Sequence, residues 1–195
     1  LREVKSRQEA LILQADLLAL EKWSETWLLK FNLSKCHVLT LGKFENIVYA
    51  HRFELCNKEL EHVEKEKDLG VTFDSELSFV DHINDKINKA NANLGLIRRS
   101  FSYLDCEMFK KLYTAFVRPH LEYAQAVWSP RLQKCINSLE NVQIRATKLV
   151  NGMSDLTYNA RLKQLNLPTL AFRRARGDKI EVYKHLHKYD AVAIT

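Results

Sequence analysis

The sequence has 195 residues, of which 46% are hydrophobic and 28% charged, and it contains only 5 glycines and 3 prolines. A chain of this size buries a sizeable core as one domain or as two small ones. The low glycine and proline contents exclude a collagen-like repeat and argue against a disordered chain or a β-sandwich. The composition therefore favours a helix-rich protein.

The net charge of +6 is distributed unevenly along the chain. Residues 1–97 have a net charge of −3, whereas residues 98–195 have a net charge of +9. A strongly basic half indicates a polyanionic partner, most commonly nucleic acid, because clustered Lys and Arg side chains attract phosphates.

The cysteine spacing, the apolar runs and the first residue of the sequence each give a further expectation. Four cysteines are widely spaced and form no C-x-x-C pair, which predicts reduced thiols in an intracellular protein, nuclear or cytoplasmic. No apolar run approaches the roughly 18 residues that a membrane span needs, so we expect no membrane partner. The start at Leu1, without an initiator Met, is typical of a piece of a longer protein.

The first part of the chain predicts a helix and short strands. Residues 6–30 repeat apolar side chains at steps of three and four, which indicates a helix. The stripe consists of Leu13, Leu17, Leu20, Trp23 and Trp27. Residues 36–41 predict a strand. Strands at 52–56 and 60–63 flank a predicted hairpin turn at Asn57-Lys58, the charged run 64–68 predicts a solvated turn, and 69–73 predicts a further strand.

The pattern changes at Ser78 and predicts helices from there onward. An apolar stripe over about six turns marks the first one, and it consists of Phe79, Ile83, Ile87, Ala90, Leu94, Ile97 and Phe101. Further helices are predicted up to Pro119, from Leu121 to Pro130, from Leu132 towards a C′ glycine at Gly152, near 157–165, and from Pro168 through about Lys188. The predicted fold class is α+β: a small antiparallel β-sheet with a helix in residues 1–76, followed by an all-helical bundle in residues 77–195.

Motifs for catalysis are missing from the 195 residues. The sequence contains no G-x-S-x-G, no P-loop and no G-x-G-x-x-G. Asp81 and Asp85 share a helix face at i, i+4, where negative charge near a helix N-terminus is favourable. His185 and His187 lie at i, i+2, off a common face. We therefore predict no metal site and no cofactor in this chain.

Polar and basic side chains on the predicted helices of the second half form the candidate nucleic-acid surface. Such side chains neutralise phosphates without reading sequence. The candidates are Lys86, Lys89, Asn93, Arg98 and Arg99 on the long helix, and Arg173, Arg174 and Arg176 on the last one, with Arg145 and Lys148 near the end of the helix before Gly152. The alternatives are ordinary solvated helix faces and, for Arg173 or Arg174, a buried arginine paired with Asp178 or Glu181.

Several blocks together resemble the reverse transcriptases of non-LTR (LINE-type) retrotransposons, RNA-directed DNA polymerases. They occur in the expected order and extend over nearly the whole chain. The blocks are Asp16-Leu-Leu-Ala-Leu-Glu-Lys-Trp23, Trp27-Leu-Leu-Lys-Phe-Asn-Leu-Ser-Lys35, Glu66-Lys-Asp-Leu-Gly-Val71, Lys89-Ala-Asn-Ala-Asn-Leu-Gly-Leu-Ile97, Val117-Arg-Pro-His-Leu-Glu-Tyr-Ala124, Val127-Trp-Ser-Pro130 and Arg173-Arg-Ala-Arg-Gly-Asp178.

The resemblance implies roles for both parts of the chain. Residues 1–76 are similar to the end of the polymerase palm, where Lys35 matches a lysine that assists departure of pyrophosphate as an accessory catalytic group. Residues 77–195 are similar to the thumb and the region after it, and the long helix would lie along the template–primer duplex. The implied primer grip consists of Asp68, Leu69, Gly70 and Val71, in which Gly70 allows close approach of backbone to the primer.

The family's catalytic Tyr-x-Asp-Asp turn is absent from this sequence. We therefore expect no polymerisation by this chain alone, with Mg²⁺ bound only in the full-length polymerase. The expected partners are an RNA–DNA or DNA duplex and an upstream polymerase half, without which Trp23, Trp27 and Leu41 would be partly exposed. The alternative function is a domesticated helical binding or scaffold protein with no polymerase role.

Overall fold

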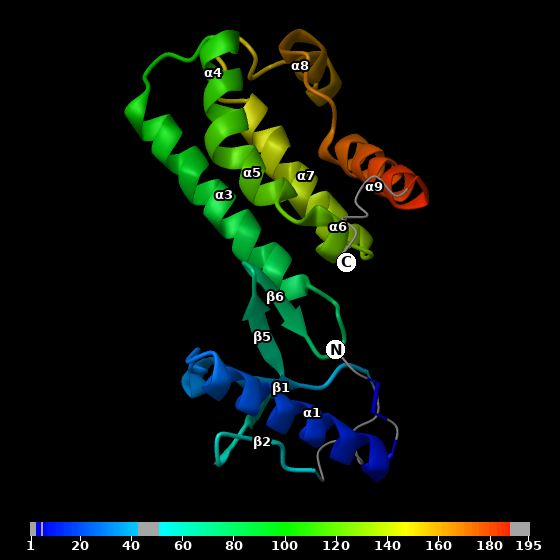
Figure 1. Ribbon diagram of the computed structural model, residues 1–195. Helices are drawn as coiled ribbons and strands as arrows, with labels where there is room; N and C mark the ends of the chain where they lie inside the picture. The colour runs from blue at the N-terminus through cyan, green and yellow to red at the C-terminus, as the bar shows by residue number, and fades with distance from the viewer. Residues whose placement is uncertain (1–2, 5, 43–50, 188–195) are drawn as a thin grey trace. The chain divides into compact units, whose positions relative to one another are not determined.

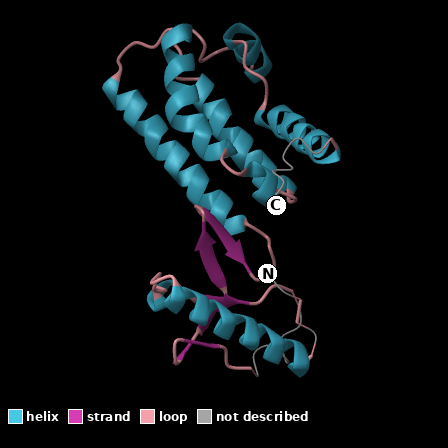
Figure 2. Cartoon of the chain, viewed as in Figure 1, coloured by secondary structure: helices cyan, strands magenta, loops and turns pink. Residues whose placement is uncertain are grey.

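The structure is a computed structural model that describes the chain except for residues 1–2, 5, 43–50 and 188–195. The chain divides into two compact units, Leu1–Ser78 and Phe79–Thr195, so the boundary lies two residues beyond the predicted one. The first unit combines a helix with short strands and the second is helical (Figures 1 and 2). The α+β fold class with a helical C-terminal part is confirmed.

The first unit is built on helix α1, Arg7–Thr26. Ser6 caps it, because the Ser6 hydroxyl accepts a hydrogen bond from the Glu9 amide at 3.2 Å, at the spacing of a capping box. Ala10 on α1 lies in a small buried cluster with Phe53, Leu55 and Leu60, against which Leu13 and Leu17 also pack. The N-terminal half of α1 therefore holds this unit together.

The C-terminal half of α1 leaves its apolar side chains in solvent. Trp23 and Trp27 are 50% and 65% exposed, and Leu20 is 49% exposed. Leu41 is half-buried. The expected partial exposure of both tryptophans and of Leu41 is thus confirmed.

Within the described part of the first unit, the strands form three two-stranded ladders. Strand β1, His37–Leu39, pairs in parallel with β4, Glu61–Val63. Strand β2, Glu54–Leu55, pairs antiparallel with β3, Lys58–Glu59, and β5, Lys65–Asp68, pairs antiparallel with β6, Val71–Asp74. One small antiparallel sheet was predicted, whereas the strands form separate pairs and one pair is parallel.

Both hairpins are closed by two residues of positive φ. The β2–β3 turn is Cys56-Asn57, with φ of 52° and 57°, one residue before the predicted Asn57-Lys58. Such a turn matches the right-handed twist of the strands, and asparagine tolerates the left-handed conformation. Residues 65–68 of the charged run 64–68, which was predicted as a solvated turn, form strand β5. Most side chains of this strand are exposed, so it does not need the alternation of apolar and polar residues that a half-buried strand shows.

The second unit is a set of packed helices that begins with α3, Val80–Ser100. The chain continues through α4, Cys106–Leu112, the π-helical segment Tyr113–Val117, α5, Arg118–Glu122, α6, Gln125–Trp128, α7, Gln133–Thr147, α8, Tyr158–Leu165, and α9, Leu170–Leu186. Helix α3 packs against both α5 and α7. Its predicted stripe is buried at Ile83, Ala90, Leu94 and Ile97.

The helix predicted to stop before Pro119 instead continues past it. The Arg118 amide donates to the Tyr113 carbonyl, which is an i to i−5 bond of the π type. The wider π turn lies directly before Pro119, whose missing N–H would otherwise break the α-helical ladder. Two other boundaries also differ: Gly152 lies beyond α7 rather than at its C′ position, and Pro168 precedes Thr169, the N-cap of α9.

A hydrogen-bonded cluster around Gln143 joins these helices. The Tyr113 hydroxyl donates to Gln143 Oε1 at 2.7 Å, and Gln143 Nε2 donates to the Tyr158 hydroxyl at 3.0 Å and to the Pro168 carbonyl at 2.9 Å. The Tyr158 hydroxyl donates to Glu140. Burial raises the pKa of the Tyr113 hydroxyl, which keeps it protonated as a donor.

Replacing Gln143 by Leu will destabilise the second unit by about 2–5 kcal/mol, because buried polar groups of Tyr113 and Pro168 lose their partner. Urea unfolding followed by circular dichroism measures this change. The matched control is Gln164→Leu on α8, where the side chain is exposed, and it should change stability by less than about 0.5 kcal/mol. Equal stabilities of the two variants would refute the role of Gln143.

Candidate nucleic-acid interface

The predicted primer-grip residues form the tip of the β5–β6 hairpin. Asp68 pairs with Val71, and the two residues between them, Leu69 and Gly70, have φ of 46° and 81°. The predicted strand at 69–73 therefore begins at Val71, because two consecutive positive φ angles make a turn. Leu69 is 83% exposed. The tip thus presents one apolar side chain next to a glycine, which has no side chain.

Lys35, the predicted accessory catalytic residue, ends a single 3-10 turn, Leu33–Lys35. Asn32 caps this turn, because its Oδ1 accepts from the Ser34 amide at 3.1 Å and from the Ser34 hydroxyl at 2.6 Å. The Lys35 side chain is exposed. The turn is locally defined by its cap, and the lysine faces solvent.

Two of the four candidate cations on α3 are not available at the surface. Lys86 is buried, with only 9% exposure, so its expected placement on the solvent-facing side was wrong. It lies three residues from Ile83 and four from Ala90, which puts it on the buried stripe itself. Lys89 pairs with Asp85, with 2.9 Å between Nζ and Oδ2.

The side chain of Asn93 forms hydrogen bonds within the helical unit, so it is not directed only towards solvent. Its Nδ2 donates to the Phe116 carbonyl at 2.6 Å and lies 3.1 Å from His120 Nε2. The Phe116 carbonyl belongs to the π-helical segment, where the regular ladder is interrupted. Arg98 and Arg99, in the last turn of α3, are exposed as expected.

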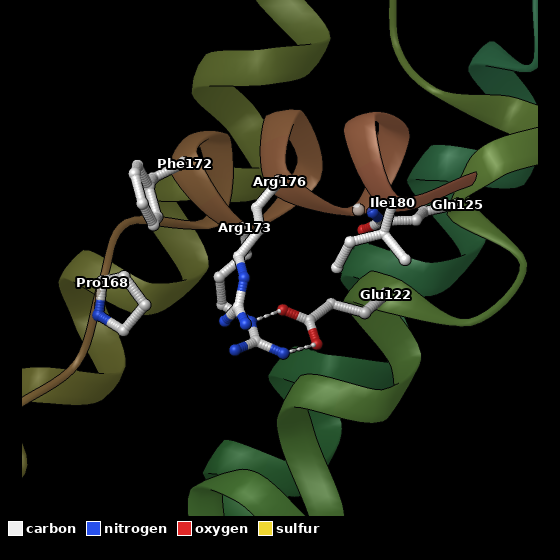
Figure 3. Close-up of a pocket in the computed structure, with 8 residues that line it drawn as sticks. Glu122, Gln125, Pro168, Phe172, Arg173, Arg176 and Ile180 are labelled. Carbon is white, nitrogen blue, oxygen red and sulfur yellow. Dashed lines mark hydrogen bonds and ion pairs between the residues drawn. The ribbon is translucent and has the colours of Figure 1, made fainter. Parts of the chain in front are cut away.

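The three arginines of α9 that were predicted as candidates lie in three different environments, and Figure 3 shows two of them, Arg173 and Arg176. Arg173 binds Glu122 through both Nε and Nη2, the latter at 2.9 Å from Oε2, and this carboxylate raises the pKa of Arg173. The open alternative of pairing with Asp178 or Glu181 is therefore wrong for Arg173. Arg118 Nε lies 3.6 Å from the same carboxylate.

Arg174 is buried with 5% exposure, and among the residues that the structure describes its two Nη atoms have no hydrogen-bond partner. Desolvation lowers the pKa of Arg174. It is thus the buried arginine that the sequence left open: Glu140, Glu122 and Asp178 act on it electrostatically, and because it is buried it is not a surface phosphate ligand.

Arg176 lines a groove of about 440 Å³ together with Phe172, Arg173 and Ile180 of α9 (Figure 3). A Cβ atom at Gly177 would lie 2.4 Å from Gln125 Nε2, so the glycine permits close approach of Gln125. Glu122 also lines this groove and neutralises Arg173. The α9 groove is therefore weakly basic.

Each helix within the described ranges is too short or too polar to span a lipid bilayer. Over the same residues, no three His, Cys, Asp or Glu side chains gather in a way that could hold a metal ion.

Comparison with known proteins gives a distant and partial similarity. Over 151 residues, or 72% of this chain, the sequence is 24% identical to the RNA-directed DNA polymerase from mobile element jockey of Drosophila melanogaster, covering 15% of that protein. Over 113 residues, or 56% of the chain, it is 28% identical to an uncharacterized protein of Caenorhabditis elegans, covering 57% of it. The chain therefore spans less than two thirds of either relative.

No family model and no solved structure matches the chain. The similarity to the jockey polymerase supports an origin related to reverse transcriptases. At this coarse level, the resemblance seen in the sequence blocks is confirmed.

Replacing Glu122 by Gln will destabilise the second unit by about 1–3 kcal/mol, because Arg173 and Arg118 then share no partly buried carboxylate. Thermal or urea unfolding measures the loss. Glu181→Gln serves as the matched control, since the Glu181–Lys184 pair is more exposed and should contribute less than about 0.5 kcal/mol. A Glu122→Gln protein as stable as this control would contradict the assigned role.

Proposed function

We propose that this chain is related to non-LTR reverse transcriptases and that its helical unit holds the backbone of a template–primer duplex. The distant similarity to the jockey polymerase over 72% of the chain carries the proposal. The excess of positive charge in residues 98–195 supports it independently, because backbone contacts require cations and no sequence readout.

The proposed duplex contacts use the cations that remain accessible. Lys86 and Arg174 are buried, and Lys89 and Arg173 are engaged by carboxylates. A buried or paired cation would have to be exposed or separated from its partner before it met a phosphate. Of the predicted set, Arg98, Arg99 and Arg176 are therefore the residues we assign to phosphate contact.

The β5–β6 hairpin tip is the proposed primer grip. An exposed Leu69 beside Gly70 offers an apolar contact for a sugar and a backbone that a nucleic-acid strand approaches closely. Lys35 keeps its proposed accessory role, which requires a mobile, solvent-facing cation near a triphosphate.

The test is binding of the purified chain to an RNA–DNA hybrid of about 20 base pairs, measured by fluorescence anisotropy at several salt concentrations. We expect binding at about 50 mM salt and a log–log salt slope of about −3 or steeper, because each of at least three phosphate contacts contributes roughly −0.9. Absence of binding at low salt, or binding that is independent of salt, would contradict the proposal.

A scaffold function is the second candidate, and the exposed face of α1 favours it. Leu20, Trp23 and Trp27, which follow one another at steps of three and four residues, are each about half exposed or more, and exposed apolar patches commonly mark protein interfaces. A chain that binds no hybrid, but binds a protein through a surface that Trp27→Ser abolishes, would support this second function instead.

A further inference from the structure

Two cavities are lined by residues of α3, of α7 and of the segments that follow these helices. The first has a volume of about 460 Å³, and Asn84, Ile87, Ser138, Asn141, Ile144 and Arg145 line it. The second has a volume of about 560 Å³, lies where the two helices end, and includes Arg98 and Lys148 in its lining. We call the surface formed by both the α3–α7 groove.

The two cavities follow one another along the same pair of helices. Helices α3 and α7 pack together and run in the same direction (Figure 1). Arg145 lines the first cavity and Lys148 the second, and a spacing of three residues places them one above the other on one helix face. Along the axis of α3, Asn84 of the first cavity and Arg98 of the second are about 21 Å apart at 1.5 Å per residue, which corresponds to about six base pairs of a duplex at 3.4 Å each.

The lining of the α3–α7 groove contains three cations and no carboxylate. Arg98, Arg145 and Lys148 are exposed, and over the described residues none of the three forms an ion pair. Arg145 Nε donates to the Asn141 carbonyl at 3.3 Å, which leaves its two terminal nitrogens available. The α9 groove differs, because Glu122 lies inside it and neutralises Arg173.

Helix-end electrostatics explains only part of this arrangement. Arg98, Arg145 and Lys148 lie in or next to the last turns of their helices, where positive charge offsets the partial negative charge of the carbonyl end. That effect does not require the amide and hydroxyl groups of Asn84, Asn141 and Ser138, which continue the polar lining away from the helix ends. Such side chains are common donors to phosphate oxygens.

The geometry points to the α3–α7 groove as a binding site for the sugar–phosphate backbone of a nucleic-acid duplex, with Arg98, Arg145 and Lys148 as phosphate ligands. This inference rests on the proposed function and locates it on the helical unit. Phe101, which is half-buried, is the aromatic residue of the lining. Single-strand sites stack bases on exposed aromatic rings, so the lining favours duplex over single strand.

The test compares two triple variants that each lower the net charge from +6 to zero. The groove variant is R98E/R145E/K148E, and the matched control is R131E/K163E/K179E, which reverses exposed cations of the same helical unit outside the groove lining. Binding to an RNA–DNA hybrid of about 20 base pairs at about 50 mM salt should weaken at least about 30-fold in the groove variant and less than about 3-fold in the control.

A second variant, R98A/R145A/K148A, removes the contacts without adding negative charge, and circular dichroism verifies the helix content of all proteins. Its salt slope should be smaller than that of the wild type by about 2 to 3. If the wild-type chain binds the hybrid and both triple reversals weaken it equally, the groove inference fails and the proposed function stands. If the wild type binds no hybrid, both fail. A preference for single strands over duplex would also overturn the inference.

Discussion

The side-chain amide of Gln143 uses its oxygen and its nitrogen inside the helical unit: it accepts from Tyr113 and donates to Tyr158 and to the Pro168 carbonyl. These partners belong to the π-helical segment, to α8 and to the loop before α9. A buried amide must satisfy its hydrogen bonds to be stable, so this one residue fixes how three other segments approach α7. Glu140, one turn earlier, receives the Leu170 and Ala171 amides at 3.2 Å and completes the attachment of α9.

Helix α7 therefore has two faces with different roles. Leu139, Val142, Gln143 and Ala146 are buried in the core of the unit. Ser138, Asn141, Arg145 and Lys148 lie on the other side and line the α3–α7 groove. Because the inner face is held by packing and by satisfied hydrogen bonds, the outer face keeps its cations at fixed spacing, which a backbone-binding surface requires.

Much of this fold follows from sequence periodicity. The stripe of α3 and the helical character of the second unit were predictable because long amphipathic helices carry a strong 3.6-residue signal. The exposed tryptophans of α1 and the buried arginine of α9 were also anticipated. The position of Lys86 was predicted wrongly because the residue lies at the edge of the apolar stripe. A lysine has a long apolar stem, which allows it to be buried there between Ile83 and Ala90.

Other features depend on contacts that the sequence does not reveal locally. Glu122 meets Arg173 across 51 positions, and Asn93 meets the Phe116 carbonyl across 23. Pro119 stops no helix because the π turn before it accommodates the missing N–H, an arrangement set by packing against α3. The α3–α7 groove likewise joins residues from two helices, so neither helix alone predicts it.

Contact between the α3–α7 groove and the backbone of a nucleic-acid duplex would shield the cations of the groove from chemical modification. Lysine acetylation followed by mass spectrometry, with and without an RNA–DNA hybrid, tests it most directly because Lys148 lies in the groove and Lys163 and Lys179 lie outside its lining. We expect the hybrid to slow acetylation of Lys148 by about fivefold or more, because this lysine is held against phosphate, and to leave Lys163 and Lys179 unchanged. Bound hybrid that protects Lys163 or Lys179 while Lys148 reacts at its original rate would contradict it.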